Sequence, residues 1–172
     1  MASFVGRLLS ALGRRSAPSI EFSSARLAYR QLRAEEIPDL CQRITLACLA
    51  DMSPDGTDLR DPIAFAKRQR NSYVVILNGE IIGFFGLYLP DLSFGFWIAP
   101  EHRGRGYAGE VVGSFMKHAA FDPLLRKVGC WEDNFACRRI IEGNGFTSFR
   151  RLKLQSRFCD SPRVAIFFRR TR

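Results

Sequence analysis

The sequence predicts a single mixed α+β domain with about six or seven strands and about four helices. Two patterns support this prediction. Short apolar or alternating segments, bounded by Gly, Pro, Asn and Asp, are typical of strands. Other segments repeat their apolar residues every three to four positions, as an amphipathic helix does. The elements follow the order β-α-α-β-β-β-α-β-α-β-β, and the three successive strands in its middle favour a mostly antiparallel sheet.

The clearest element is a β-hairpin in the middle of the chain. Two apolar runs, Ser72–Leu77 and Glu80–Leu89, flank Asn78-Gly79, a dipeptide that favours a type I′ turn. Leu92–Ile98 follows as the next strand after a second turn. Further strands are expected at Arg26–Arg33, Lys127–Trp131, Gly145–Leu154 and Arg163–Arg169.

Four segments are expected to form helices. A first helix, over Ala34–Cys48, begins with acidic residues that suit the helix dipole. Pro62–Arg70 opens with a proline, which the first helical turn tolerates, and Phe135–Gly143 follows Asp133-Asn134. The most regular helix follows Gly106. Its apolar stripe consists of Ala108, Val111, Val112, Phe115, Met116 and Ala119.

Composition and charge place the chain among soluble globular proteins. It has 172 residues, of which 47% are apolar and 25% charged, and this suits one domain. The net charge of +9 is concentrated at the two ends: residues 1–33 carry six Arg and one Glu, and residues 150–172 carry eight Lys or Arg and one Asp. Such ends can bind RNA or an acidic partner, but no nucleic-acid-binding motif accompanies them, so nucleic acid is not favoured.

The N-terminus is expected to be a basic, flexible leader over residues 1–22, with the domain spanning 23–172. Residues 1–19 contain three Arg, several Ser and no acid. That composition also suits an organellar transit peptide or a membrane-surface helix. We favour the leader and a cytoplasmic protein, with a mitochondrial or other organellar location as the alternative. No apolar run reaches the roughly 20 residues that span a bilayer, and we expect a monomer or a homodimer.

The five cysteines do not indicate a metal site. They lie at Cys41, Cys48, Cys130, Cys137 and Cys159, with no CxxC spacing and only two His in the chain. We therefore expect no bound metal. Their odd number and irregular spacing favour free thiols in a reducing compartment.

A basic, glycine-bearing loop joins the strand that ends at Ile98 to the most regular helix. Arg103, Gly104, Arg105 and Gly106 form this loop. The first amides of a helix have no intrahelical acceptor, and the helix dipole favours an anion there. Glycines allow the backbone to approach a phosphate, and arginines add charged donors. The loop therefore predicts a phosphate site.

The whole pattern resembles the GNAT superfamily of acetyl-CoA-dependent N-acetyltransferases, over about residues 25–170. The family's coenzyme loop reads Gln/Arg-x-x-Gly-x-Gly/Ala, which here is RGRGYA, with Pro100 upstream and Asn134 at the expected later position. FGFWIAP, GYAGE and N-x-x-C-x-x-I-x-E-x-x-G-F are similar to the branch that acetylates the N-termini of ribosomal proteins, and to its small-molecule relatives.

This resemblance implies a splayed sheet that holds acetyl-CoA as a cosubstrate. The strand that ends at Ile98 and the strand around Cys130 would diverge, so that their free edges pair with the pantetheine arm. The glycine loop would bind the pyrophosphate, and Asn134 would bond the pantetheine or orient the thioester. The implied coenzyme-binding residues are Phe96, Trp97, Ile98, Arg103, Gly104, Arg105, Gly106, Tyr107, Ala108, Gly109 and Asn134.

The catalytic groups are less defined than the coenzyme loop. The Tyr that the family commonly uses as the acid is replaced by Ile141, and the strand Glu of many relatives is replaced by Ser93. Cys137 is a candidate acid because a thiol can protonate a departing thiolate, although it is equally suited to filling space. Glu110 is the candidate base, with Asp91 and Asp133 as alternatives, or it serves only the helix dipole.

The sequence thus predicts an acyltransferase that moves an acetyl group to a primary amine by direct attack. The acceptor would be a protein N-terminus or a small-molecule amine, and no motif decides between them. The competing hypothesis is a non-catalytic acyl-CoA-binding module of the same fold, whose basic ends dock on RNA, a membrane or an acidic partner.

Overall fold

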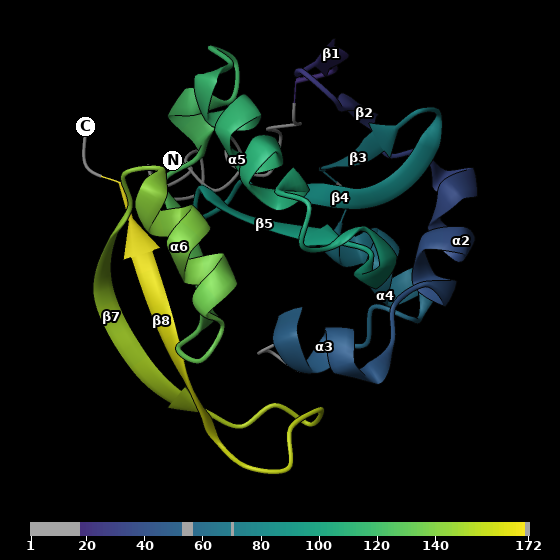
Figure 1. Ribbon diagram of the computed structural model, residues 1–172. Coiled ribbons are helices and arrows are strands. Elements are labelled where there is room, and N and C mark those ends of the chain that lie inside the picture. The colour runs from purple at the N-terminus through teal and green to yellow at the C-terminus, as the bar shows by residue number, and fades with distance from the viewer. Residues whose placement is uncertain (1–17, 53–56, 70, 171–172) are drawn as a thin grey trace, which may run out of the picture.

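The structure, a computed structural model, describes residues 18–52, 57–69 and 71–170. Its centre is one eight-stranded sheet with the strand order β1-β2-β3-β4-β5-β6-β8-β7 (Figure 1). The strands are β1 (Phe22–Ser23), β2 (Ala28–Gln31), β3 (Ser72–Leu77), β4 (Glu80–Tyr88), β5 (Ser93–Ile98), β6 (Lys127–Trp131), β7 (Thr147–Leu154) and β8 (Arg163–Arg169). All neighbouring strands are antiparallel except β5 and β6. The predicted mixed α+β fold is therefore confirmed.

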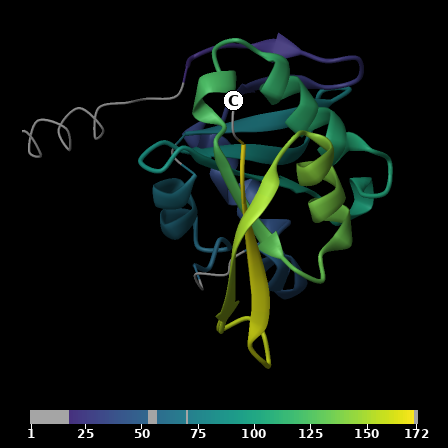
Figure 2. The ribbon, with the colours of Figure 1, turned by 90° about the vertical axis from the view of Figure 1, so that its left-hand side faces the viewer.

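The helices cover both faces of the sheet. They are α2 (Ile37–Gln42), α3 (Leu46–Met52), α4 (Pro62–Arg68), α5 (Tyr107–Lys117) and α6 (Phe135–Gly143), and three short 3-10 segments lie at Ala34–Glu36, Pro100–His102 and Asp122–Leu124. Figure 2 shows α4 and α6 on opposite sides of the sheet, with β7 and β8 extending beyond them. Among the described residues, no helix is long and apolar enough to cross a membrane.

Each face of the sheet has its own hydrophobic core. On the α5 face, Val111, Val112, Phe115 and Met116 of the predicted stripe are buried and Ala108 is partly buried, whereas Ala119 is exposed beyond the end of α5. The Phe115 ring stacks on Phe85 of β4 with centroids 4.0 Å apart. On the other face, α2, α3 and α4 enclose a second core, in which the rings of Phe65 and Phe84 pack edge to face with their centroids 5.3 Å apart. The sheet is thus held from both sides, which fixes the position of β5 between the two cores.

The hairpin between β3 and β4 has the predicted turn. Asn78 and Gly79 both have positive φ, 50° and 86°, as a type I′ turn requires. The strand that follows the hairpin, β5, pairs with β4 along its whole length. These three strands carry the chain directly to the glycine loop.

β5 and β6 diverge after a single pairing. In the described part of the chain, only Ser93 of β5 is paired with Lys127 of β6. Beyond that point β6 pairs with β8 on its other side, from Lys127 to Trp131. The facing edges of β5 and β6 therefore open into a wedge, which is the splay that the family resemblance implied.

Two elements differ from the sequence prediction. The helix expected over Ala34–Cys48 is broken between α2 and α3, because Thr45 caps a new helix: its Oγ1 accepts from the Cys48 amide at 3.2 Å. At the break, Arg43 reaches the Ile81 carbonyl and Glu101. The short strand β1 was not predicted. Residues 18–52, 57–69 and 71–170 therefore contain eight strands and five α-helices, compared with the expected six or seven strands and four helices.

The predicted boundary between leader and domain is not tested. Residues 1–17 lie outside the described residues, and the division at residue 22 stays a prediction. Phe22 already belongs to β1, and its ring lies 5.0 Å from that of Phe115.

Candidate functional site

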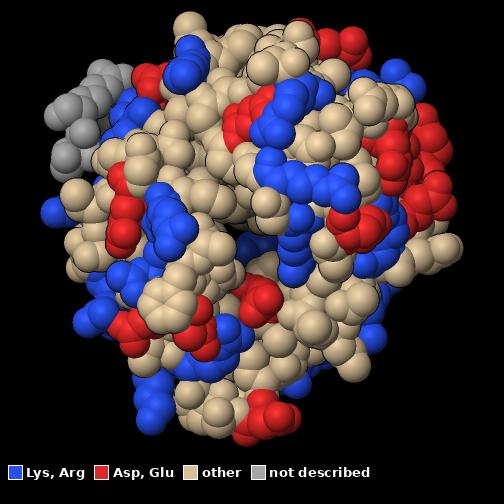
Figure 3. Space-filling model, in the orientation of Figure 1, with Lys and Arg blue, Asp and Glu red and all other residues tan. Residues whose placement is uncertain are grey.

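A cleft of about 1150 Å³ lies at the wedge between β5 and β6. Its lining comes from both faces of the sheet: the start of α5 and α6 on one side, and α3, α4 and the end of β4 on the other. Figure 3 shows the molecule hollowed between α3, α5 and α6, with Lys and Arg side chains along one rim. The lining includes every predicted coenzyme residue except Arg105.

The glycine loop has the backbone of an anion site. Gly104 and Gly106 both have positive φ, 76° and 79°, and Gly106 is the N-cap of α5. In the described chain, the amides of residues 104–109 have no backbone acceptor, since the first bond back to the loop is from the Glu110 amide to Gly106. Several N–H groups are thus left to bind a ligand at the mouth of the cleft.

Arg103 braces this loop from inside. Its Nε donates to the Ile98 carbonyl at 2.9 Å, and its Nη2 contacts the Cys48 sulfur at 3.5 Å. The guanidinium therefore ties the loop to the end of β5 and to α3. Arg103 is exposed and still lines the cleft, so it stays a candidate for anion binding together with Arg105 and the backbone amides.

Glu110 and Arg26 hold the loop from outside. The Glu110 carboxylate accepts from Ser24 Oγ at 2.6 Å, from the Arg26 amide at 2.9 Å and from Arg26 Nε at 2.7 Å. Arg26 also donates to the Arg105 carbonyl at 3.1 Å and lies over the Tyr107 ring at 4.6 Å. The segment before β2 is thereby fastened to the first turn of α5, a role for Arg26 that the sequence analysis missed.

This arrangement does not favour Glu110 as the catalytic base. Burial raises the pKa of its carboxyl, but the hydrogen bonds from Ser24 and Arg26 outweigh burial and lower the pKa below its usual value. Among the described residues that line the cleft, Glu110 does not appear. Its carboxylate is engaged in holding the loop, and it lies apart from the other candidate catalytic residues.

The three candidate residues of β5 point in alternating directions. Trp97 faces α2–α4, is 4% exposed and stacks on Phe84 with ring centroids 5.6 Å apart. Phe96 and Ile98 belong to the α5 side. All three contribute backbone to the free edge of β5, although the Ile98 carbonyl is already used by Arg103.

Asn134 and Cys137 lie together at the start of α6. Asn134 is the N-cap, and its Oδ1 accepts from the Cys137 amide at 3.0 Å. The Cys137 thiol interacts with Cys130 on β6. This interaction raises the pKa of Cys137 and lowers that of Cys130, and burial raises the pKa of Cys137 further. Cys137 therefore stays protonated at neutral pH, as a proton donor must.

The other candidate groups differ in their access to the cleft. Ile141, at the position of the missing Tyr, is fully buried in the core. Ser93 donates to Asp91 at 2.7 Å, and both line the cleft. The pKa of Asp133 is lowered, chiefly by its hydrogen bond from Arg163 at 2.6 Å. Asp91 is thus a candidate base that lines the cleft and is hydrogen-bonded to the first residue of β5.

Arg163 joins α3 to the sheet at the far end of the cleft. It donates to the Ala50 carbonyl at 2.9 Å, to Asp133, and lies 3.6 Å from Asp51. The Trp131 indole donates to the same carbonyl at 2.7 Å, and Arg163 stacks on its ring at 4.8 Å. α3 therefore forms a fixed wall of the cleft. No local sequence signal indicates this contact, because its partners are far apart in the chain.

A comparison with protein-family models identifies the family. Residues 26–147 match the Acetyltransferase (GNAT) domain, which is most of the chain. The protein therefore belongs to the GNAT acetyltransferases, and it is an acyltransferase. A search of curated proteins finds no match.

Solved structures with the same fold include ribosomal-protein acetyltransferases. RimL, a ribosomal L7/L12 alpha-N-protein acetyltransferase in complex with coenzyme A, is 17% identical with a TM-score of 0.66, covering 91% of this chain and 97% of that one. An acetyl transferase from Salmonella typhimurium that modifies the N-terminal serine of L7/L12 is 17% identical with a TM-score of 0.67, covering 87% and 96%. The microcin C7 self-immunity acetyltransferase MccE, in complex with acetyl-CoA and AMP, is 12% identical with a TM-score of 0.64, covering 84% and 92%.

Proposed function

We propose that this protein transfers an acetyl group from acetyl-CoA to a primary amine by direct attack. The observation that carries the proposal is the pair of positive-φ glycines at the start of α5, located at the mouth of a cleft between two diverging strands. The acceptor is a protein N-terminus or a small-molecule amine. Relatives of the same fold hold coenzyme A or acetyl-CoA, and RimL acts on a protein N-terminus.

The described residues fit acetyl-CoA. The amides of residues 104–109 suit the pyrophosphate, and nothing lies within 4 Å of where a Cβ would stand on Gly104 or Gly109. The edges of β5 and β6 suit the amides of the pantetheine arm. Cys137 and Asn134 line the same cleft, beyond the glycine loop.

Acetyl-CoA supplies an activated acetyl thioester. In the transfer, the amine nitrogen bonds to the acetyl carbon and the carbon–sulfur bond breaks, while the nitrogen loses one proton and the departing thiolate gains one. Cys137 is the candidate donor of that proton, because it lines the cleft and its raised pKa keeps the thiol protonated at neutral pH. Asp91, through Ser93 and water, is suited to accept the amine proton.

A non-catalytic module that docks through basic ends is less favoured. Much of the positive charge on the C-terminal segment is neutralised within the molecule. The ion pairs are Arg151–Glu132, Arg157–Asp58, Arg163–Asp133 and Arg170–Asp122. Paired arginines offer less to an external anion than the net charge of this segment suggests.

Release of free coenzyme A in the presence of a panel of amines and N-terminal peptides tests the proposal. We expect turnover with at least one acceptor, with the product heavier by one acetyl group in mass spectrometry. Calorimetry with acetyl-CoA gives a separate measurement. Absence of coenzyme binding by a demonstrably folded protein would overturn the proposal, whereas binding without turnover on any amine would favour the non-catalytic module.

A further inference from the structure

The side of the cleft opposite α5 and α6 contains a buried hydrogen-bonded chain that the coenzyme site does not use. Ser72 Oγ donates to Gln69 Oε1 at 2.8 Å, and Gln69 Nε2 donates to the Tyr88 hydroxyl oxygen at 3.1 Å. Gln69 is 3% exposed and Ser72 is 2% exposed. Buried polar groups are costly unless bonded, and a satisfied chain of them is rigid. The chain therefore fixes the position of the Tyr88 hydroxyl.

Gly86 leaves the space that this chain needs. A Cβ on Gly86 would lie 2.4 Å from Gln69 Oε1 and 3.1 Å from Ser72 Oγ. The first distance is far inside van der Waals contact, so any other residue at this position would displace the amide. Three positions, Gln69, Ser72 and Gly86, thus combine to hold one phenol.

The hydroxyl lies where β5 and β6 separate. Tyr88 is paired across the sheet with Ser93, the residue of β5 that bridges to β6. One step further along the same face, a Cβ on Gly95 would lie 3.5 Å from the Tyr88 hydroxyl. Because Gly95 has no side chain, the hydroxyl lies directly over the backbone of β5, next to Phe96.

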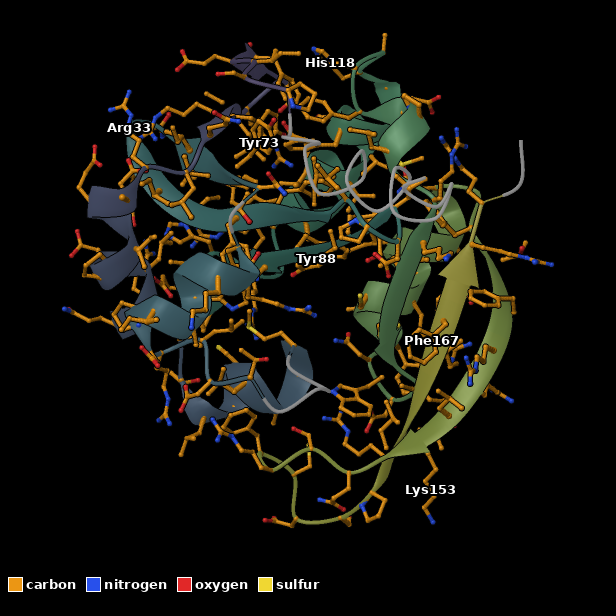
Figure 4. All side chains as sticks on the ribbon, turned by 180° about the vertical axis from the view of Figure 1, so that it is seen from behind. Arg33, Tyr73, Tyr88, His118, Lys153 and Phe167 are labelled. Carbon is orange, nitrogen blue, oxygen red and sulfur yellow. The ribbon has the colours of Figure 1, made fainter. Side chains whose placement is uncertain are left out.

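The opposite wall of this part of the cleft comes from the other half of the sheet. Gly129 of β6 again lacks a side chain, and the position of its Cβ would be 3.2 Å from the Phe167 ring of β8. Figure 4, seen from behind, shows Tyr88 and Phe167 on the two halves of the sheet. Both residues line the cleft, together with Asp91 and Ser93. Tyr88 and Phe167 therefore line this part of the cleft beside Gly95 and Gly129, which present only backbone.

We propose that Tyr88 contacts the acceptor amine during transfer, and that Gln69 and Ser72 are positioning residues that hold its hydroxyl in place. The inference rests on the proposed function, in which the thioester lies along the edge of β5 from the α5 side. The amine must then approach from the opposite side of the cleft, which is the side lined by Tyr88. A hydroxyl at this point can hydrogen-bond the amine and orient its lone pair toward the acetyl carbon.

The test compares Tyr88→Phe with the wild type, using acetyl-CoA and the best acceptor from the amine panel. We expect kcat/KM for the acceptor to fall by about 100-fold, since misplacing an attacking group has effects of that order. The Kd for acetyl-CoA measured by calorimetry should stay within about twofold of wild type, because the coenzyme loop is untouched. Tyr73→Phe is the matched control: it removes the hydroxyl of a buried tyrosine outside the cleft lining and should leave kcat/KM unchanged.

Two further variants separate positioning from simple structure. Gln69→Met removes the amide but keeps its volume, and Gly86→Ala displaces the amide while its added Cβ lies at van der Waals distance, 3.4 Å, from the Tyr88 hydroxyl. Each should lower acceptor kcat/KM by about 10-fold in the wild-type background, and neither should lower it further in the Tyr88→Phe background. A general loss of stability would act equally in both backgrounds.

The outcomes distinguish the inference from the function on which it rests. An active wild type with an unaffected Tyr88→Phe variant would overturn the inference alone. Equal losses for Gln69→Met in both backgrounds would overturn the positioning role of Gln69. A wild type that binds acetyl-CoA but acetylates no amine would overturn the proposed function, and this inference with it.

Discussion

The two sides of the cleft are built from the chain in different ways. The proposed coenzyme side comes mainly from one continuous segment, from β5 through the glycine loop to α5, and the groups that it offers a ligand are mostly backbone amides. The proposed acceptor side is assembled from α3, α4, the end of β4, and β8, and its polar groups are hydrogen-bonded side chains. A site made of backbone depends on local conformation, whereas a site made of side chains depends on contacts between distant elements. Substitutions on the two sides should therefore separate coenzyme affinity from acceptor turnover.

The largest effect is expected from Gly106→Val on the coenzyme side. Gly106 has φ 79°, a conformation that a β-branched residue adopts only with strain. We expect the Kd for acetyl-CoA to rise by about 100-fold, because strain of a few kcal/mol would move the amides at the start of α5. Isothermal titration calorimetry measures this directly.

Gly113→Ala is the matched control for that variant. Gly113 lies inside α5, and its added Cβ would be in ordinary contact, 3.9 Å from Asn144 Oδ1. Alanine favours the helix, so coenzyme affinity should be unchanged and stability slightly higher. If Gly106→Val bound acetyl-CoA as tightly as this control, the glycine loop would not be the phosphate site.

Cys137 lies where the two sides meet, and its substitution should change kcat. Cys137→Ala removes the protonated thiol, and we expect kcat to fall by about 100-fold, the lower end of the range for a lost proton donor. Cys137→Ser keeps a donor and should retain most of the activity. Steady-state kinetics at saturating acetyl-CoA separates the two variants, and an alanine variant with wild-type kcat would mean that the thiol only fills space.

Arg163 is the corresponding test of the acceptor side. Arg163→Met removes the contacts to Ala50, Asp51 and Asp133 that hold α3. We expect KM for the acceptor to rise by about fivefold and stability to fall by about 1–2 kcal/mol, the usual scale for lost charged hydrogen bonds. The Kd for acetyl-CoA should not change. Thermal unfolding measures the loss of stability, and steady-state kinetics with varied acceptor measures KM.

Arg151→Met is the control for Arg163. Arg151 pairs with Glu132, but its side chain is 63% exposed, and an exposed pair contributes little. The variant should match wild type in stability and kinetics. A change in coenzyme affinity in Arg163→Met alone would show that α3 supports both sides of the cleft, and the proposed separation would fail.

The same contrast explains what the sequence could and could not predict. The Asn78-Gly79 turn, the strands at Lys127–Trp131 and Arg163–Arg169 and the helix at Phe135–Gly143 follow from neighbouring residues, and all were predicted with their observed bounds. The conformation of the glycine loop is equally local. These features need no knowledge of the tertiary structure.

The contacts that give individual side chains their roles are not local. Glu110 is hydrogen-bonded to Arg26, 84 positions away in the sequence, and Gln69 is hydrogen-bonded to Tyr88, 19 positions away. Nothing near Glu110 in the sequence indicates that its carboxylate is already engaged, so it was selected as a base on its position in the helix alone. The contact of Arg103 with the Cys48 sulfur could not be predicted either, because the two residues lie 55 positions apart in the chain.

The smallest effect is expected in the pH dependence of stability of Glu110→Gln. The folded-state pKa of Glu110 is lowered because the bonds from Ser24 and Arg26 outweigh burial. A carboxylate with a lowered pKa stabilises the fold above its unfolded pKa, about 4.3, and this contribution is lost as the pH falls through the folded pKa. Wild type should therefore lose stability between pH 5 and its acid limit more steeply than Glu110→Gln, as chemical denaturation at a series of pH values would measure. If stability fell equally steeply with pH in both proteins, the hydrogen bonds between Arg26 and Glu110 would not contribute to stability. The coenzyme loop would then be held by its own backbone.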